Sequence, residues 1–240
     1  MVYVYRVLTL RDLNPDVDQI LTIRAEQASQ PSTGISHVVC GVVTGATLVV
    51  ALLYFCALYF IWRYARLNPR ALNKPSGIRL QKYAPIVYVF VVCSSLAEIA
   101  LCVWLLLQYK IHQNLPNNEI LIGSRFLLFC ASWSTLTAGT YSLLFLHPVW
   151  STHVVSSIGA QAIWVFFTWL FWIVGAGIVN NAMPFLMTTG NCTGIIYCGQ
   201  VQSLFAIAVL EIIILTGGMV TMMYLAWSST RDLLRPAASR

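Results

Sequence analysis

The chain has 240 residues, of which 58% are hydrophobic and only 9% are charged, and its mean hydropathy is +0.74. A soluble domain carries about 25% charged residues, so this composition excludes a water-facing surface of ordinary size and predicts a helical membrane protein. The formal net charge of +6 does not indicate a nucleic-acid partner, because the basic residues gather in short segments between apolar runs.

Five apolar runs are long enough to cross about 30 Å of hydrocarbon, which takes roughly 20 helical residues. They cover approximately residues 38–62, 84–108, 120–146, 157–180 and 202–227. Backbone polar groups in lipid must be hydrogen-bonded internally, and none of the runs alternates as a barrel strand does. Each run is therefore predicted to be a transmembrane helix.

The segments that flank these runs predict the orientation of the chain. Residues 63–83 hold six basic residues and no acid, and the tail, 229–240, holds three arginines and one aspartate. Basic segments remain in the cytoplasm, so both are predicted there, which leaves residues 1–37 and the N-terminus outside. The cations of the 63–83 segment are also candidates for contact with anionic lipid headgroups. They are Arg63, Arg66, Arg70, Lys74, Arg79 and Lys82.

A predicted extracytoplasmic loop, 181–201, carries two modification signals. Asn191 opens an Asn-Cys-Thr triplet, which is an acceptor pattern for N-glycosylation. Cys192 and Cys198 share this loop in an oxidising compartment, so we expect a disulfide between them, with two free thiols as the alternative.

Two acids interrupt the apolar runs, Glu98 and Glu211. At 1.5 Å per residue they lie about 15 Å and about 13 Å from the same predicted membrane boundary. If their helices are neighbours, the carboxyls would share a proton or hold a cation, and Arg125 is the basic residue predicted to reach towards them. The functional reading is a proton or ion relay, or an acid that acts on a lipid. We favour neutral acids that join helices, an interaction worth about 1 kcal/mol.

Small and aromatic residues indicate where helices pack. The sequences GVVTG at 41–45, GAG at 175–177 and TGG at 216–218 predict close helix approach, within the chain or with a second copy of it. Aromatic residues crowd the fourth run, where Trp169 and Trp172 lie too deep for an interfacial belt. They predict an aromatic seam between helices, with a flat face for sterol or lipid as the alternative.

Signatures of catalysis are missing from the sequence. It contains no cluster with metal-ligand spacing, no GxSxG nucleophile turn and no phosphate-binding loop. We therefore expect no metal and no cofactor.

Several of these segments, in order, resemble a MARVEL domain of the fungal type, a four-helix membrane module. The resemblance covers residues from about 78 to 230. It rests on RFLLFCASWSTLTAGTYSLLFL at 125–146, FTWLFWIVGAGIV at 167–179, the loop NCTGIIYCGQ, and the final run with Glu211. The sequence departs from the module by its additional run at 38–62.

The resemblance implies an all-α integral membrane protein, with a MARVEL-like four-helix domain over 84–228 and one additional N-terminal helix. It implies a non-enzymatic role in organising sterol-rich membrane or in vesicle trafficking, at the plasma membrane or on secretory vesicles. Expected partners are membrane lipids, including sterol and anionic lipid, and a second copy of the chain.

Two other functions remain open on the sequence alone. The first is a membrane-integral terpene cyclase in which Glu98 and Glu211 would protonate a prenyl chain; such enzymes look like seven-span proteins, whereas this chain has five runs. The second is a small transporter or channel. Its hydroxyl side chains between 132 and 142 spread around the helix and form no single polar stripe.

Overall fold

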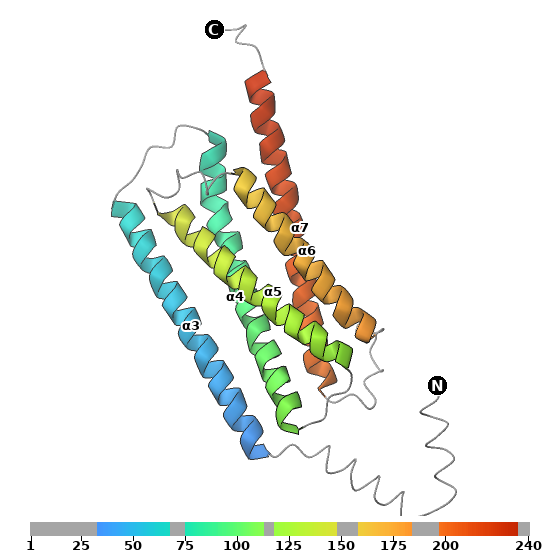
Figure 1. The fold of residues 1–240 in the computed structure, drawn as a ribbon. Helices are drawn as coiled ribbons and strands as arrows, with labels where there is room; N and C mark the ends of the chain where they lie inside the picture. Colours follow the sequence, from blue (N-terminus) through green and yellow to red (C-terminus); the bar gives the residue numbers. More distant parts are fainter. Residues whose placement is uncertain (1–32, 68–74, 113–117, 148–157, 184–196, 235–240) are drawn as a thin grey trace, which may run out of the picture.

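The protein is all-α in the computed structural model, which describes residues 33–67, 75–112, 118–147, 158–183 and 197–234. Five helices follow one another along this described part of the chain (Figure 1). They are α3 (Thr33–Leu67), α4 (Pro75–His112), α5 (Asn118–Leu146), α6 (Ile158–Ala182) and α7 (Cys198–Leu234). Each is long and apolar enough to cross a membrane, which confirms the predicted class.

The helices are longer than the apolar runs that predict them. Residues 63–67 complete α3 and residues 75–83 open α4, so only 68–74 of the predicted basic loop lie between helices. The hydrophobic length of a bilayer fixes the apolar part of a helix, but the helical backbone continues into the headgroup region. Lysine and arginine side chains are hydrated there while their stems cover apolar surface.

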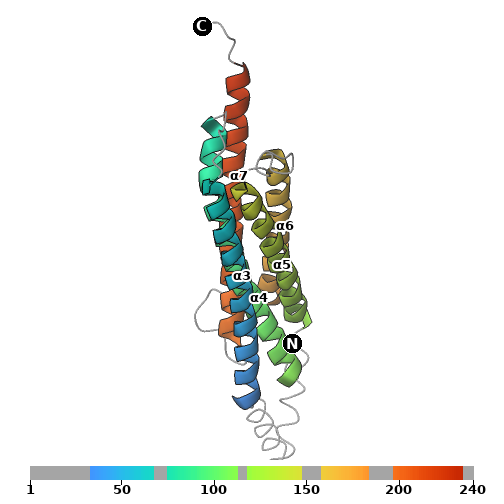
Figure 2. The same ribbon diagram turned by 90° about the vertical axis from the view of Figure 1, so that its left-hand side faces the viewer.

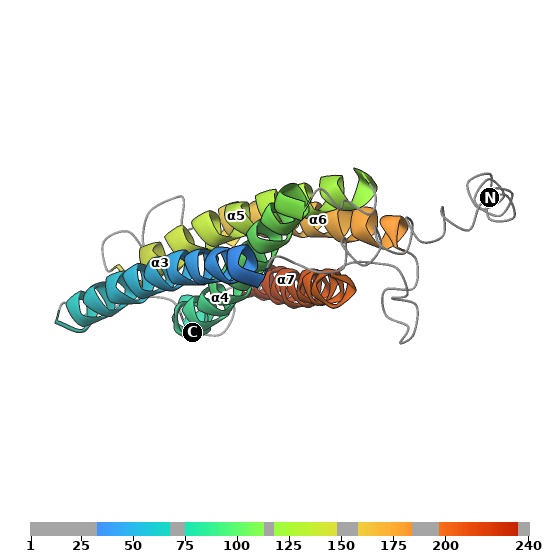
Figure 3. The ribbon, with the colours of Figure 1, turned by 90° about the horizontal axis from the view of Figure 1, so that it is seen from below.

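Four helices form a closed bundle, and the fifth packs on its outside. Along the chain α4, α5, α6 and α7 each contact the next, and α7 returns to contact α4. Successive helices run in opposite directions (Figure 1). The first, α3, packs against α4 and α5 on the side away from α6 (Figures 2 and 3). Only 6% of its most apolar stretch is buried, against 39% for α4, α5 and α6, so α3 is peripheral.

Glycine brings α5 and α6 together at two places. A Cβ atom on Gly175 would lie 2.6 Å from Leu127 Cδ2, and one on Gly123 would lie 2.8 Å from Val179 Cγ2. Both distances are shorter than van der Waals contact, so these helices approach closely because the side chains are absent. By contrast, at the other glycines of the GVVTG, GAG and TGG sequences, an added Cβ atom would meet no described atom within 4 Å. These are Gly41, Gly45, Gly177, Gly217 and Gly218.

The aromatic residues of α6 divide between the two sides of the helix. Trp164 and Trp172 are buried in the bundle, as the predicted seam requires. Phe166 and Phe167 are exposed on the outer surface. The helix therefore contributes both to the core and to the surface that lipid covers.

Candidate functional site

The core of the site is a carboxyl pair, Glu98 of α4 and Glu211 of α7, both fully buried. They lie equally far from the span ends at Ile111 and Cys198, about 20 Å at 1.5 Å per residue. Since α4 and α7 are in contact, the two acids share a depth on neighbouring helices. Glu98 lies within electrostatic range of Glu211.

Two consecutive serines of α4 bind Glu211 across the helix interface. Ser94 Oγ donates to Glu211 Oε1 at 2.5 Å, and Ser95 Oγ donates to the same oxygen at 3.1 Å. Ser94 Oγ also lies 2.9 Å from the carbonyl oxygen of Phe90 and 3.2 Å from that of Val91. A hydroxyl has one proton, so Ser94 divides its hydrogen bond among these three acceptors. Ser95 is buried and binds only Glu211 among the contacts of the described residues.

Glu98 occupies the next turn of α4 on the same face as Ser95. Neither of its oxygens has a hydrogen-bond partner among the described residues, and neither has Glu211 Oε2. An ionised carboxylate at this depth costs on the order of 3 kcal/mol, and a second anion beside it adds repulsion. Two separate anions are therefore unfavourable here. No hydrogen bond joins the two carboxyls to each other in the structure, and the described bonds between helices are those from Ser94 and Ser95 to Glu211.

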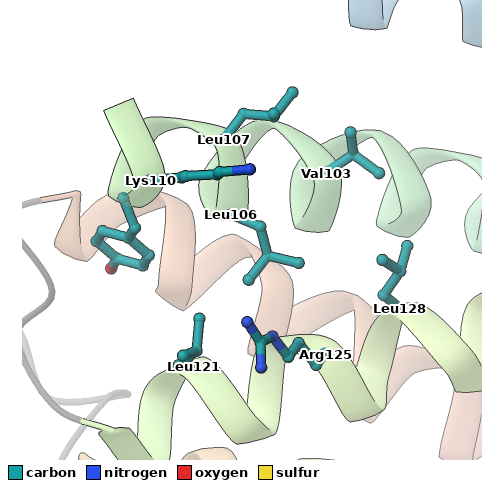
Figure 4. A pocket seen from close by; sticks show the side chains of 8 residues that line it. Val103, Leu106, Leu107, Lys110, Leu121, Arg125 and Leu128 are labelled. Carbon is teal, nitrogen blue, oxygen red and sulfur yellow. The ribbon is translucent and has the colours of Figure 1, made fainter. Parts of the chain in front are cut away.

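Arg125 does not join the carboxyl pair, although the sequence predicts that it reaches towards it. Its side chain is exposed and, with Lys110 of the facing helix, lines an apolar hollow between α4 and α5 (Figure 4). The position along α5 is about one turn from the predicted membrane boundary, as expected. The rotation of α5 about its own axis, which the sequence does not reveal, directs the side chain outwards.

Further hydrogen bonds between side chains connect the other helices. Trp172 Nε1 donates to Ser134 Oγ at 2.9 Å between α6 and α5, and Trp169 Nε1 donates to Thr216 Oγ1 at 2.9 Å between α6 and α7. Four hydroxyl residues on the turns near the acids thus form hydrogen bonds between helices, and they are Ser94, Ser95, Ser134 and Thr216. Ser132 instead bonds the backbone of its own helix, and Thr135 Oγ1 has no described partner.

One buried polar contact escapes the sequence analysis. Tyr88 of α4 donates its hydroxyl to Gln161 Oε1 of α6 at 3.0 Å, and Gln161 is fully buried. The signal was present, because an amide inside an apolar run requires a partner in lipid.

Other predicted residues fall at the ends of the bundle. Cys198, the first residue of α7, is disulfide-bonded, while Asn191 and Cys192 lie outside the described residues. Pairing of Cys192 with Cys198 stays a prediction.

Of the predicted headgroup contacts, Arg63 and Arg66 lie near the end of α3, and the guanidinium of Arg66 lies 4.2 Å from the centre of the Trp62 ring. Arg79 and Lys82 lie in the first turns of α4, and Arg70 and Lys74 are outside the described residues.

The chemistry of the carboxyl pair is limited by its enclosure. Neither acid lines the four cavities described among these residues, which have volumes of about 550, 320, 390 and 500 Å³. Within the same part of the chain, no group of three histidine, cysteine, aspartate or glutamate side chains is arranged to hold a metal ion.

Comparison with protein-family models, with curated proteins and with solved structures finds no match to this chain. Its class therefore rests on the fold itself. Five helices of transmembrane length and composition define a multi-pass membrane protein.

Proposed function

We propose that this protein is a non-enzymatic membrane protein that organises membrane domains or vesicle trafficking through helix packing and lipid contact. The observation that carries the proposal is that polar side chains within the spans form hydrogen bonds from one helix to another. Glu211 accepts two hydrogen bonds from α4, and Trp172 and Trp169 of α6 donate to α5 and α7. Polar groups in these positions join helices and leave an apolar outer surface for lipid.

The MARVEL-like module in this proposal is the bundle of α4 to α7. The resemblance comes from the sequence, and a closed ring of four helices with α3 outside it is compatible with a four-helix module and one addition. A structure-based alignment to an experimentally solved MARVEL domain tests this: a different helix order or handedness would remove the resemblance.

For orientation we propose an external N-terminus and a cytoplasmic C-terminus, in the plasma membrane or secretory vesicles. Arg66 in the last turn of α3 and Arg231 in the last turn of α7 support it, because both lie at the end of the bundle predicted to be cytoplasmic. Glycosidase treatment of the parent and of Asn191→Gln checks this orientation. Addition of a glycan at residues introduced near 68–74, where the cytoplasm is expected, would reverse it.

The organising role is tested by reconstituting the purified chain in giant vesicles that contain labelled sterol and phospholipid. We expect the protein to concentrate in, or to enlarge, one class of lipid domain. The same vesicles with a single-span apolar peptide serve as the control. Uniform distribution of protein and lipid at every protein density, together with unchanged vesicle delivery in cells that lack the protein, would contradict the proposal.

The cyclase alternative keeps one supporting observation, the absence of described hydrogen-bond partners for Glu98. An acid without partners retains a proton that it can donate. Product analysis with prenylated substrates separates the two functions. We expect no product from the parent chain, whereas turnover that disappears in Glu98→Gln or Glu211→Gln would identify an enzyme.

A further inference from the structure

Two cations border one hollow on the surface of the bundle, Lys110 from the end of α4 and Arg125 from the first part of α5. Lys110 and Arg125 line a hollow of about 550 Å³, and its walls include Val103, Leu106 and Leu128 (Figure 4). Both side chains are exposed. No ion pair or hydrogen bond joins either of them to another described residue. The nearest acid in the chain, Glu119, lines a separate cavity between α5 and α6.

The depth of Arg125 makes its isolation significant. It lies about 10 Å inside the span that begins at Asn118, at 1.5 Å per residue. A guanidinium at the edge of the hydrocarbon is costly unless it reaches water or an anion, and long basic side chains there extend towards the interface. Lipid phosphate groups are the anions at that level. Arginine binds phosphate through two parallel N–H donors, and lysine adds a second charge.

An apolar groove lies next to this hollow, towards the middle of the membrane. It has a volume of about 500 Å³ and lies between α3, α4 and α5, with walls that include Val42, Ala46 and Ala100. Val103 and Leu107 line both the groove and the hollow, so the two adjoin along α4. Along α4 the groove runs from Leu107 to Leu96, about 16 Å at 1.5 Å per residue. That is close to half of a hydrocarbon core about 30 Å thick, which is the depth of one leaflet.

We propose that this composite surface is a binding site for one anionic phospholipid. Its phosphate lies between Lys110 and Arg125, and one acyl chain fills the groove between α3, α4 and α5. A net negative headgroup is preferred, because the ammonium of a zwitterionic lipid competes with the two side chains for the phosphate. This proposal rests on the proposed function, in which the protein contacts lipid, and it specifies the class of lipid that is bound. It lies at the opposite end of the bundle from the predicted headgroup contacts Arg63 and Arg66.

The test counts lipids bound to the purified full chain by native mass spectrometry, after detergent exchange and titration with defined molecules. The molecules are phosphatidylglycerol, phosphatidylcholine, diacylglycerol with the same acyl chains, and glycerol phosphate without chains. We expect one molecule of phosphatidylglycerol to be retained at least tenfold more tightly than diacylglycerol, and glycerol phosphate not to be retained.

Variants separate the two halves of the site. Lys110→Gln with Arg125→Gln should weaken the retention of phosphatidylglycerol about tenfold or more and bring it to the level of diacylglycerol. Ala46→Phe should fill the groove and weaken the binding of both phosphatidylglycerol and diacylglycerol, while leaving the two cations in place. The matched control is Arg63→Gln with Arg66→Gln, which removes two cations at the other end and should change nothing.

Three outcomes would overturn the site. They are equal retention of phosphatidylglycerol and diacylglycerol, unchanged binding in the double variant, and binding of glycerol phosphate as tight as that of the lipid. Melting temperatures confirm that each variant is folded, and Ala46→Phe provides a second reading if the double variant unfolds. Because this experiment measures binding alone, a negative result leaves the domain-organising role standing, and failure of that role leaves the site standing.

Discussion

At the scale of single residues, the position of Glu211 explains how an acid is accommodated in this bundle. One of its oxygens accepts from Ser94 and Ser95, and the acid is fully enclosed by helices. The hydrogen bonds replace contacts with water that lipid does not offer. Model systems assign such interhelical bonds about 0.6–2 kcal/mol each. Glu211 is therefore expected to stabilise the α4–α7 interface.

Replacement of this acid tests that expectation. Glu211→Ala leaves the buried hydroxyl of Ser95 without its acceptor and opens a cavity, so we expect a loss of about 2 kcal/mol in the free energy of unfolding. Glu211→Gln retains an acceptor oxygen and should lose less. Thermal melting in detergent measures both, with Thr137→Ala as the control, since Thr137 is partly exposed and bonds only its own helix. Equal melting of Glu211→Ala and the parent would contradict the interpretation.

The carboxyl pair also shows what sequence reasoning resolves at this scale. Depth is predictable, because residue number along a helix fixes it, and the two acids do share a depth. The direction in which a side chain points is not predictable in this way, because it depends on how each helix is rotated about its axis. For Arg125, the sequence predicts the correct helix and the correct end of the bundle, but the wrong direction for the side chain. Gln161 was overlooked although its buried amide carried the same kind of information as the acids.

At the scale of the elements, the contact between α5 and α6 depends on glycine. Gly175 leaves space for Leu127, and Gly123 leaves space for Val179. Of these two glycines, only Gly175 belongs to one of the small-residue patterns in the sequence. Small residues are frequent in membrane helices, and a pattern does not tell which face of the helix is packed. Gly177, two residues from Gly175, faces open space in the described structure.

This pair of positions offers a matched comparison within one helix. Gly175→Val would force the side chains of Leu127 and Phe126 aside, and overpacking of this kind costs about 1–3 kcal/mol. Gly177→Val makes the same substitution at a position without a described neighbour. Its free energy of unfolding should lie within about 0.5 kcal/mol of that of the parent. Melting temperatures of the two variants, each compared with the parent, give the result. A lower stability for Gly177→Val than for Gly175→Val would place the helix contact elsewhere.

At the scale of the whole molecule, the order and number of the helices follow from the sequence, and their bounds do not. Apolar length predicts how many times a chain crosses a membrane, because lipid excludes unpaired backbone groups. It does not predict where a helix ends in the headgroup region, where water satisfies the backbone. That is why α4 begins at Pro75 and not near residue 84. Nor does apolarity distinguish a central helix from a peripheral one, as α3 shows.

The peripheral position of α3 predicts that the bundle is stable without it. A chain that begins at residue 75 keeps the contacts among α4, α5, α6 and α7 and loses the bond between Tyr54 and Ser142. We expect it to remain a monodisperse, helical protein with a lower melting temperature than the full chain. Size-exclusion chromatography, circular dichroism and melting provide the check. Aggregation of the shortened chain in several detergents would show that α3 is part of the core.

The length of α7 has a further consequence. Its apolar span ends at Leu225, but the helix continues to Leu234, beyond the ends of its neighbours (Figure 1). At 1.5 Å per residue this forms a rigid stalk of up to about 13 Å. The Debye length at physiological ionic strength is about 8 Å, so the far end of the stalk is largely screened from the surface potential of the bilayer. A tag, probe or binding domain fused after Leu234 would stand clear of the lipid headgroups, accessible to soluble molecules.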